Sequence, residues 1–164
     1  MRAPRDLDFS EYFAARVQRF RRVAYAFCGN WHEAEDLVQA MFVQLYRRWR
    51  RVRPDTVDAY ARRILLNAFL AGRRTSGREY VTSSPPERES PPGRDSHARL
   101  DVERALSGLT PRQRAMVVLR FLEDLPVAEV AALLGVAEGT VKSQTARGVE
   151  ALRAVLPAPT TEEW

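Results

Sequence analysis

The sequence predicts an all-α protein of two small domains, and three observations support this. Hydrophobic residues recur every three or four positions along both halves of the chain, which is the spacing of one helix face. No segment alternates polar and apolar residues as a half-buried strand does. A stretch rich in proline and serine, residues 76–97, separates the halves. The 164 residues are 45% hydrophobic, which is enough for packed cores.

Two helices are predicted at the start of the chain. The first spans Phe9 to Cys28, whose apolar residues share one face, and Gly29 ends it. The second begins at Asn30, a helix-capping residue that Glu33 follows three positions later as in a capping box. Its predicted buried face consists of Leu37, Val38, Met41, Phe42, Leu45 and Trp49. Five arginines then precede Pro54, namely Arg47, Arg48, Arg50, Arg51 and Arg53.

A third helix is predicted from about Asp55 to Gly72, with one apolar and one basic face. We place the first domain at residues 1–75, the linker at 76–97, the second domain at 98–156 and a tail at 157–164. In the second domain, a short helix over 100–106 precedes a stronger helix start at Thr110. There a threonine cap, a proline and a closing Gln113 form a capping box, and the helix is expected to reach about Leu122.

The last two predicted helices resemble a helix-turn-helix. Gly135 suits the left-handed residue that ends one helix, over 125–134, and turns the chain into the next, over 138–153. The outward residues near the start of that last helix would reach base edges and phosphates in a major groove: Thr140, Lys142, Ser143, Gln144 and Arg147. An ordinary helical hairpin with a solvated polar face would show a similar pattern.

Two further surfaces are candidates for binding. The basic face of the third helix carries Arg62, Arg63, Asn67, Arg73 and Arg74, which could hold phosphates or an unpaired base. The second helix interleaves polar residues with its apolar face, namely Glu33, Glu35, Asp36, Gln39 and Gln44, and could dock on a basic partner helix. Simple solvation explains either face equally well.

Charge and composition exclude several classes of function. The formal net charge is +5, and residues 1–75 hold 15 arginines against eight acidic residues, which favours a polyanionic partner. The single cysteine, Cys28, excludes an internal disulfide and a thiolate zinc cluster. No metal-ligand spacing, phosphate loop or nucleophile motif is present, so we expect neither an enzyme nor a cofactor. No apolar run could span a membrane, and a cytoplasmic protein is expected.

Four segments resemble, in order and spacing, the extracytoplasmic-function (ECF) sigma factors of bacterial RNA polymerase. They are Glu35–Phe42, Tyr60–Asn67, Leu109–Arg114 and Gly135–Ser143. The resemblance covers about residues 9–75 and 98–156 and implies a promoter-specificity subunit with sigma regions 2 and 4.

The resemblance also implies roles for particular residues. Asp36, Gln39 and Phe42 would bind the coiled coil of the polymerase β′ subunit. The segment around Arg62, Arg63, Asn67, Arg73 and Arg74 would melt the −10 element and hold a flipped base. Region 4 would rest on the β flap and read the −35 element through Thr140, Lys142, Ser143, Gln144 and Arg147. An anti-sigma factor is a further possible partner. Gly148 lies inside the −35 helix, where it is expected to cost about 1 kcal/mol against alanine.

A second hypothesis is a stand-alone helix-turn-helix regulator that binds operators as a dimer, its first helices serving for dimerisation or sensing. The two hypotheses differ in whether promoter recognition requires polymerase. The second domain and the tail argue for such tethering, because residues 98–164 together hold eight basic residues against nine acidic ones. That domain lacks the positive surplus that tight DNA binding needs on its own.

Overall fold

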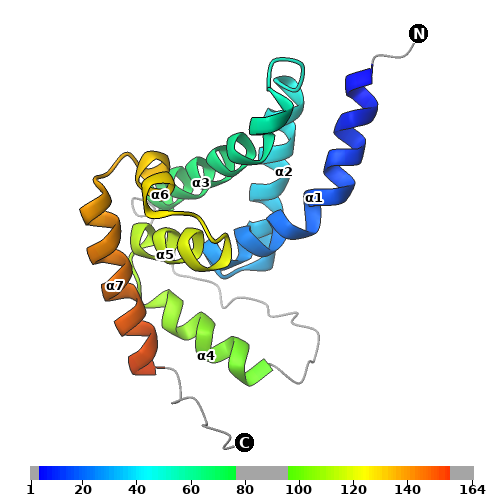
Figure 1. The fold of residues 1–164 in the computed structure, drawn as a ribbon. Coiled ribbons are helices and arrows are strands. Elements are labelled where there is room, and N and C mark those ends of the chain that lie inside the picture. Colours follow the sequence, from blue (N-terminus) through cyan, green and yellow to red (C-terminus); the bar gives the residue numbers. More distant parts are fainter. Residues whose placement is uncertain (1–3, 77–95, 156–164) are drawn as a thin grey trace, which may run out of the picture. The chain divides into compact units, whose positions relative to one another are not determined.

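The computed structural model of the chain describes residues 4–76 and 96–155, which fall into two compact units, residues 1–84 and 85–164. Within the described residues every regular element is helical (Figure 1), as the sequence predicts. The first unit contains α1 (Pro4–Cys28), α2 (Trp31–Arg47), the 3-10 turn η1 (Pro54–Thr56) and α3 (Val57–Ser76). The second unit contains α4 (Ser96–Ser107), α5 (Pro111–Val117), the π-helical turn η2 (Val118–Leu122), α6 (Val127–Leu134) and α7 (Glu138–Val155).

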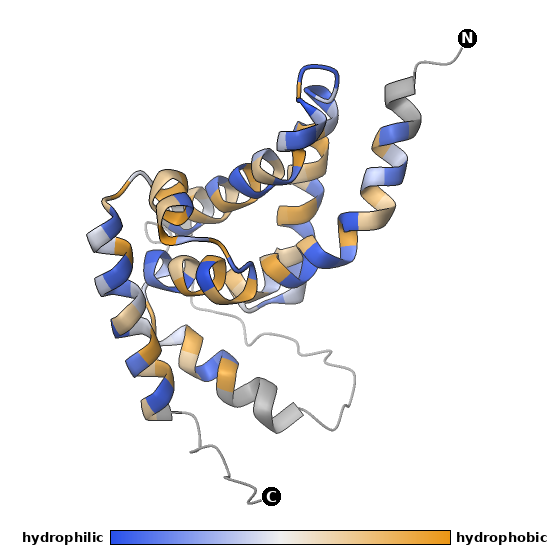
Figure 2. Cartoon of the chain, viewed as in Figure 1, coloured by the Kyte–Doolittle hydropathy of each residue, from blue (hydrophilic) through white to orange (hydrophobic). Residues whose placement is uncertain are grey.

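The first unit is a three-helix bundle whose apolar faces meet, and the orange stripes of Figure 2 run along their inner sides. Phe27 and Phe69, from α1 and α3, stack at 5.3 Å between ring centroids. At the other end, Phe9 from α1 packs edge-on against Trp49 at 5.2 Å. Leu37, predicted to be buried, is only half-buried. The fully buried large side chains of this unit are Val23, Phe27, Met41, Leu45, Leu65, Leu66 and Phe69.

The junction of α1 and α2 forms as its residues predict. Gly29 adopts φ +75°, a left-handed conformation that costs glycine little, and α1 stops there. The Asn30 side-chain oxygen accepts a hydrogen bond from the Glu33 backbone N–H at 3.0 Å, which caps α2. The Glu33 carboxylate pairs with Arg73 Nη2 from α3 at 3.3 Å. The cap therefore also joins the two helices that follow it.

Two helices are longer than the hydrophobic pattern predicts. α1 begins at Pro4 rather than Phe9, and α3 continues to Ser76, past Gly72. Periodicity detects only turns that bury an apolar residue, so polar helix ends escape it. A Cβ built on Gly72 would meet nothing within 4 Å, so that glycine marks neither a turn nor a close contact.

The second unit packs α4, α5 and α7 around Leu106, Leu109 and Val117, with Leu152 against this cluster. The predicted capping box at the start of α5 is confirmed. Thr110 Oγ1 accepts from the Gln113 backbone N–H at 3.2 Å, and Gln113 Oε1 accepts from the Thr110 backbone N–H at 3.3 Å. The predicted helix does extend to Leu122, but its last five residues form the π-helical turn η2.

A buried ion pair and a left-handed residue complete this unit. Arg114, 6% exposed, donates through Nη2 to Glu103 Oε2 at 2.8 Å, which joins α5 to α4. Gly135 has φ +66° and ends α6, as the helix-turn-helix pattern predicts. The turn before α6 contains Asp124 at φ +54°, which is uncommon for a residue with a side chain.

Gly148 has a packing role that the sequence does not reveal. A Cβ added there would lie 2.6 Å from Val117 Cγ2 and 3.7 Å from Leu109 Cδ1. Both residues belong to the cluster that α7 covers. The expected cost of Gly148 concerns helix propensity alone, and the structure adds a packing role, because the missing side chain lets α7 approach α5 closely.

Candidate nucleic-acid interface

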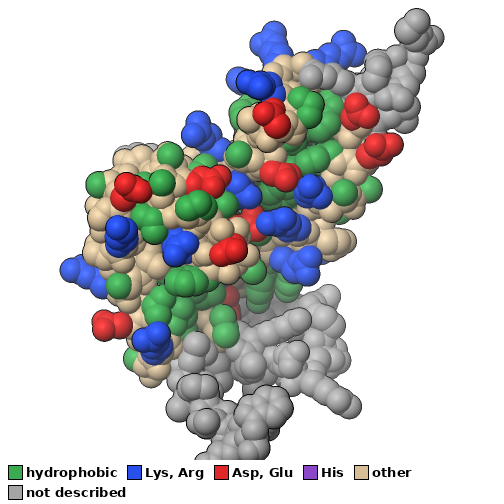
Figure 3. All heavy atoms as spheres, in the orientation of Figure 1, with side chains coloured by type: hydrophobic (Ala, Val, Ile, Leu, Met, Phe, Trp, Pro, Cys, Tyr) green, Lys and Arg blue, Asp and Glu red, His purple; other side chains and the backbone are tan. Residues whose placement is uncertain are grey.

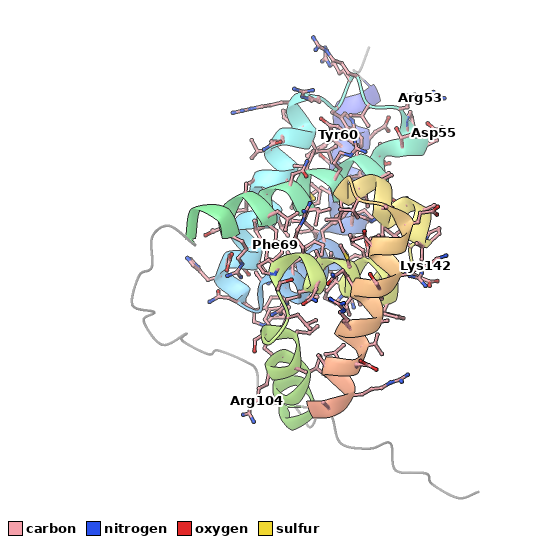
Figure 4. The ribbon with its side chains drawn as sticks, turned by 90° about the vertical axis from the view of Figure 1, so that its left-hand side faces the viewer. Arg53, Asp55, Tyr60, Phe69, Arg104 and Lys142 are labelled. Carbon is pink, nitrogen blue, oxygen red and sulfur yellow. The ribbon has the colours of Figure 1, made fainter. Side chains whose placement is uncertain are left out.

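A basic hollow lies on α3, beside the end of α2. Of the predicted residues, Arg63 and Asn67 line it and are both exposed. Tyr60, one turn before Arg63, is half-buried at the same hollow (Figure 4). The remaining lining residues are Gln44, Arg48, Ile64, Ala68 and Ala71. A cation, an amide and an aromatic ring around an apolar floor can bind a phosphate and an unpaired base together.

The other arginines predicted for this surface lie elsewhere. Arg62 is 8% exposed and its charge acts on Tyr12 and Asp58, so the prediction that it belongs to the open basic face is wrong. Arg73 donates to the Cys28 carbonyl at 3.1 Å and to Glu33, and stacks over Phe69. Both follow from helical periodicity, since positions 62, 69 and 73 share the face that looks toward α1 and α2. The side chain of Arg74 lies outside the described residues.

The last residue of α2 and the loop that joins α2 to α3 form a basic surface for which no role was predicted from the sequence. Its arginines are all exposed: Arg47, Arg48, Arg50, Arg51 and Arg53. Figure 3 shows Lys and Arg side chains projecting at this end of the first unit, and Figure 4 places Arg53 in the loop. Five cations within seven residues, next to the hollow, form an electrostatic surface for a polyanion.

Tyr12 of α1 contacts one residue at each end of this loop. The Tyr12 ring lies 5.4 Å from the Trp49 ring at the start of the loop. Its hydroxyl donates to Asp58 Oδ1 at 2.7 Å, just past the end of the loop. Arg16 Nε donates to the same carboxylate oxygen at 3.1 Å. Burial opposes ionisation of Asp58, but these hydrogen bonds and the Arg16 charge outweigh it and hold the carboxyl pKa below its usual value.

The exposed face of α2 presents two of the three residues predicted to bind a protein partner. Asp36 and Gln39 are exposed, with Val43 one further turn along and 51% exposed. Phe42 differs from the prediction, because it is 5% exposed and packs in the bundle core, its ring centroid 4.7 Å from that of Phe13. Positions 36, 39 and 43 share a face, whereas 42 lies on the adjacent inward stripe.

Four of the five predicted DNA-reading residues of α7, Thr140, Ser143, Gln144 and Arg147, share one face at the start of the helix, whereas Lys142 lies on the face of Thr145 and Val149. Thr140, Lys142, Ser143 and Arg147 are exposed, and Figure 4 labels Lys142 on this helix. Gln144 is half-buried, and its Oε1 accepts a hydrogen bond from Gln113 Nε2 of α5 at 2.6 Å. Val141 on the opposite side is fully buried. The helix is therefore amphipathic, with exposed polar residues on one side and the buried Val141 on another.

A second hollow lies in the same unit, between η2 and the middle of α7. Phe121, 59% exposed, and Val149 contribute apolar surface to it. Arg120, Lys142 and Arg153 line it with positive charge. Thr145 also lines it, is 8% exposed, and has an Oγ1 without a hydrogen-bond partner. This combination of apolar and basic groups suits an amphipathic protein segment.

Within residues 4–76 and 96–155 no three His, Cys, Asp or Glu residues gather in a way that could hold a metal ion. None of the helices in the same ranges is both long enough and apolar enough to cross a membrane.

A helical unit with a basic hollow and a second unit with a helix-turn-helix define a two-domain DNA-binding protein of the transcription class. A family model for Sigma-70 region 2 matches residues 13–79, and one for Sigma-70, region 4 matches residues 99–152. The ECF RNA polymerase sigma factor SigE of Mycolicibacterium smegmatis is 34% identical over 164 residues. That match covers 94% of this chain and 64% of the relative.

Other relatives match over more of their length. The RNA polymerase sigma-E factor of Streptomyces coelicolor is 35% identical over 155 residues, covering 93% of this chain and 88% of that protein. The fold is similar to that of the sigma factor RpoE from Bartonella quintana, solved with the anti-sigma factor NepR. Its TM-score is 0.72 at 23% identity, over 95% of this chain and 99% of that one. The chain belongs to the ECF sigma factors of the sigma-70 family, which are transcription regulators.

Proposed function

We propose that this chain binds core RNA polymerase and directs it to promoters by reading the −35 element with α7 and holding the opened −10 strand on α3. One observation carries the proposal. The same chain holds a basic hollow suited to a single strand and, in the other unit, a helix-turn-helix suited to duplex DNA.

The −10 strand would lie along the arginine loop, with one base in the hollow. Asn67 would hydrogen-bond the edge of that base, Tyr60 would stack on it and Arg63 would hold an adjacent phosphate. The loop arginines would compensate the cost of separating strands, which is a few kcal/mol per base. Arg62 and Arg73 would then support the hollow from within the bundle rather than contact DNA, since both are engaged there.

Core polymerase would bind the exposed face of α2. Asp36, Gln39 and Val43 offer a negative, a polar and an apolar contact along one stripe. A basic coiled-coil helix of the β′ subunit fits this stripe in charge. Phe42 would contribute indirectly, by holding α2 against α1 through its contacts with Phe13 and Phe20.

The second unit would dock on polymerase through the hollow between η2 and α7. Phe121 and Val149 would take the apolar side of a helix from the β flap, and the basic rim would take its acidic residues. An anti-sigma factor would compete for these exposed surfaces. The proposal assigns no catalytic step to the chain and places it in the cytoplasm, where polymerase works.

The proposal is tested by run-off transcription from promoter fragments with core polymerase, with and without this chain. Transcripts that need both components, and that share spaced −35 and −10 elements, support it. Tight binding of DNA by the chain alone, with no gain in specificity by core polymerase, would instead support a stand-alone regulator.

Matched variants locate the functions. Arg63→Ala should lower the affinity of the holoenzyme for a single-stranded −10 oligonucleotide about tenfold, because it removes a strand contact. Arg22→Ala, the same change at an exposed position of α1, should leave this affinity unchanged. Asp36→Ala should weaken assembly with core polymerase, whereas Asp55→Ala in the exposed loop should not. Equal effects of Arg63→Ala and Arg22→Ala would remove the hollow from the proposal.

A further inference from the structure

The side-chain amides of Gln113 and Gln144 form a direct pair at the start of the DNA-reading face. Gln113 lies in the first turn of α5, and Gln144 lies in the second turn of α7. Gln113 Nε2 donates to Gln144 Oε1 at 2.6 Å. Exposed neighbours flank Gln144 on α7, among them Thr140 and Arg147.

The capping box fixes which way round both amides lie. A backbone N–H can only donate, and that of Thr110 points at the Gln113 side chain at 3.3 Å. The Gln113 atom that it meets must therefore be the acceptor Oε1, which leaves the Nε2 amino group on the side of Gln144. Since that group donates, the Gln144 atom facing it must be Oε1. Because this assignment starts from a main-chain N–H, it fixes which atom is oxygen and which is nitrogen in both side-chain amides.

The remaining polar group of Gln144 is its Nε2 amino group, with two N–H donors. A free glutamine can pair with adenine through both its oxygen and its nitrogen, which requires that the amide rotate to suit the base. Here the hydrogen bond from Gln113 fixes that rotation, with Oε1 facing Gln113 and Nε2 turned away from it. A base edge that offers an acceptor fits the donors that are left: guanine through N7 and O6, adenine through N7, or thymine through O4. Cytosine offers only its N4 amino donor in the major groove, and two donors do not pair.

We propose that Gln113 is a positioning residue for promoter specificity: it orients Gln144 so that the −35 base opposite Gln144 must present an acceptor, and cytosine is excluded there. Gln113 need not touch DNA for this effect. The inference rests on the proposed function of α7 in reading the −35 element, and it adds the hydrogen-bonding class of one base and the residue that sets it.

The decisive variant is Gln113→Glu. Glutamate is the other residue that closes a capping box, so one carboxylate oxygen still accepts from Thr110 and the start of α5 is kept. Its second oxygen can only accept, so Gln144 must turn its amino group toward residue 113 and present Oε1 to the DNA. The preferred base then becomes a donor, and cytosine becomes favoured by about tenfold where wild type excludes it by about tenfold, the size of one base contact.

The experiment is run-off transcription by the reconstituted holoenzyme from a promoter library randomised across the −35 element, with transcripts counted by sequencing. Gln144→Ala first identifies the base position, as the one where the wild-type preference disappears. Gln113→Glu is then compared with Gln113→Ala, which frees the Gln144 amide and should broaden the preference at that position without inverting it. Preferences are ratios within one sample, so a partly unfolded variant changes the total transcript and leaves the ratios unaltered.

Each outcome decides the matter. Inversion from acceptor bases toward cytosine in Gln113→Glu supports the inference. An unchanged preference in that variant, or a wild-type preference for cytosine at the position, overturns it while leaving the sigma function intact. If the wild-type holoenzyme shows no −35 preference at all, the proposed function of α7 itself fails.

Discussion

Replacing Gly148 with alanine should destabilise the second unit, although alanine is the better helix former. The new Cβ would lie 2.6 Å from Val117 Cγ2, closer than two carbon atoms approach in proteins. Val117 is 5% exposed and belongs to the cluster of Leu106 and Leu109, so it has little room to move. Valine also has one strongly preferred rotamer in a helix, so its side chain cannot rotate away from the added methyl group at low energetic cost.

The magnitude follows from two opposing effects. Alanine gains about 1 kcal/mol over glycine in a helix interior. An extra methyl group forced into a packed core costs about 1–3 kcal/mol through shifted side chains and backbone. Gly139 provides the matched control in the same helix, because a Cβ there meets nothing within 4 Å. Gly148→Ala should therefore cost up to about 2 kcal/mol net, whereas Gly139→Ala keeps the part of the gain that remains near the helix start and should not destabilise the unit.

Amide hydrogen exchange of the full chain, resolved by peptide, measures this difference where it arises. Peptides from α5 and α7 should lose protection in Gly148→Ala and keep or gain it in Gly139→Ala. Peptides from α1 to α3 serve as an internal reference, because the change lies in the other unit. The double variant Gly148→Ala with Val117→Ala removes the clashing methyl groups and should recover part of the lost protection.

Two results would refute this reasoning. If Gly148→Ala raises protection as much as Gly139→Ala does, α7 does not approach α5 as closely as 2.6 Å implies. The second contrary result is a double variant that is less stable than wild type by the full sum of the two single losses. In that case the two positions act independently and the steric contact is not the cause.

Three other predictions follow from contacts described above. Asn30→Ala removes the cap of α2 and should lower the free energy of unfolding of the first unit by about 1 kcal/mol, measured as loss of hydrogen-exchange protection in peptides from α2. Glu103→Ala leaves the buried Arg114 without this partner and should lower the free energy of unfolding by up to about 3 kcal/mol. Glu35→Ala, at the more exposed pair with Arg21, should lower it by less than about 1 kcal/mol. Equal losses of stability in thermal melts would contradict the role of burial. Because the pKa of Asp58 is depressed in the folded state, its stabilising contribution is present above the ordinary aspartate pKa and is lost as the pH falls through the folded value. Acid unfolding of Asp58→Asn should therefore depend less steeply on pH in this range than that of wild type.

Most of the fold could be predicted because its signals are local. Helix faces, the Thr110 capping box and the left-handed Gly135 depend on neighbours within a few residues, and all three appear in the structure. The ends of α1 and α3 were placed too far inward, because polar turns carry no hydrophobic signal. The π-helical end at Val118–Leu122 is a departure from α-helical geometry that the hydrophobic periodicity does not distinguish from an α-helix.

The candidate site was less predictable, because which arginine faces solvent depends on tertiary packing. Arg62 and Arg63 are adjacent in sequence, yet the first is buried and the second lines the hollow. The close approach of Gly148 to Val117 depends on how α7 packs against α5, which the sequence of α7 alone does not show. The pairing of Gln113 with Gln144 joins residues 31 positions apart, a separation at which helical periodicity says nothing. Helical phase with respect to Phe69 was the available signal for Arg62, because positions 62 and 69 lie on the same face.

The double contact of Tyr12 has a thermodynamic consequence for strand capture. Its ring meets Trp49 and its hydroxyl meets Asp58, so one side chain of α1 closes the segment that carries the arginines. Ordering a free loop costs about 1–2 kcal/mol per residue in conformational entropy, and a ligand that had to order it would bind correspondingly more weakly. Here the contacts of Tyr12 already order both ends of the segment when the protein folds. The loop is preorganised, so in the proposed function a larger share of the interaction energy with an unwound strand would be available to keep the strand open.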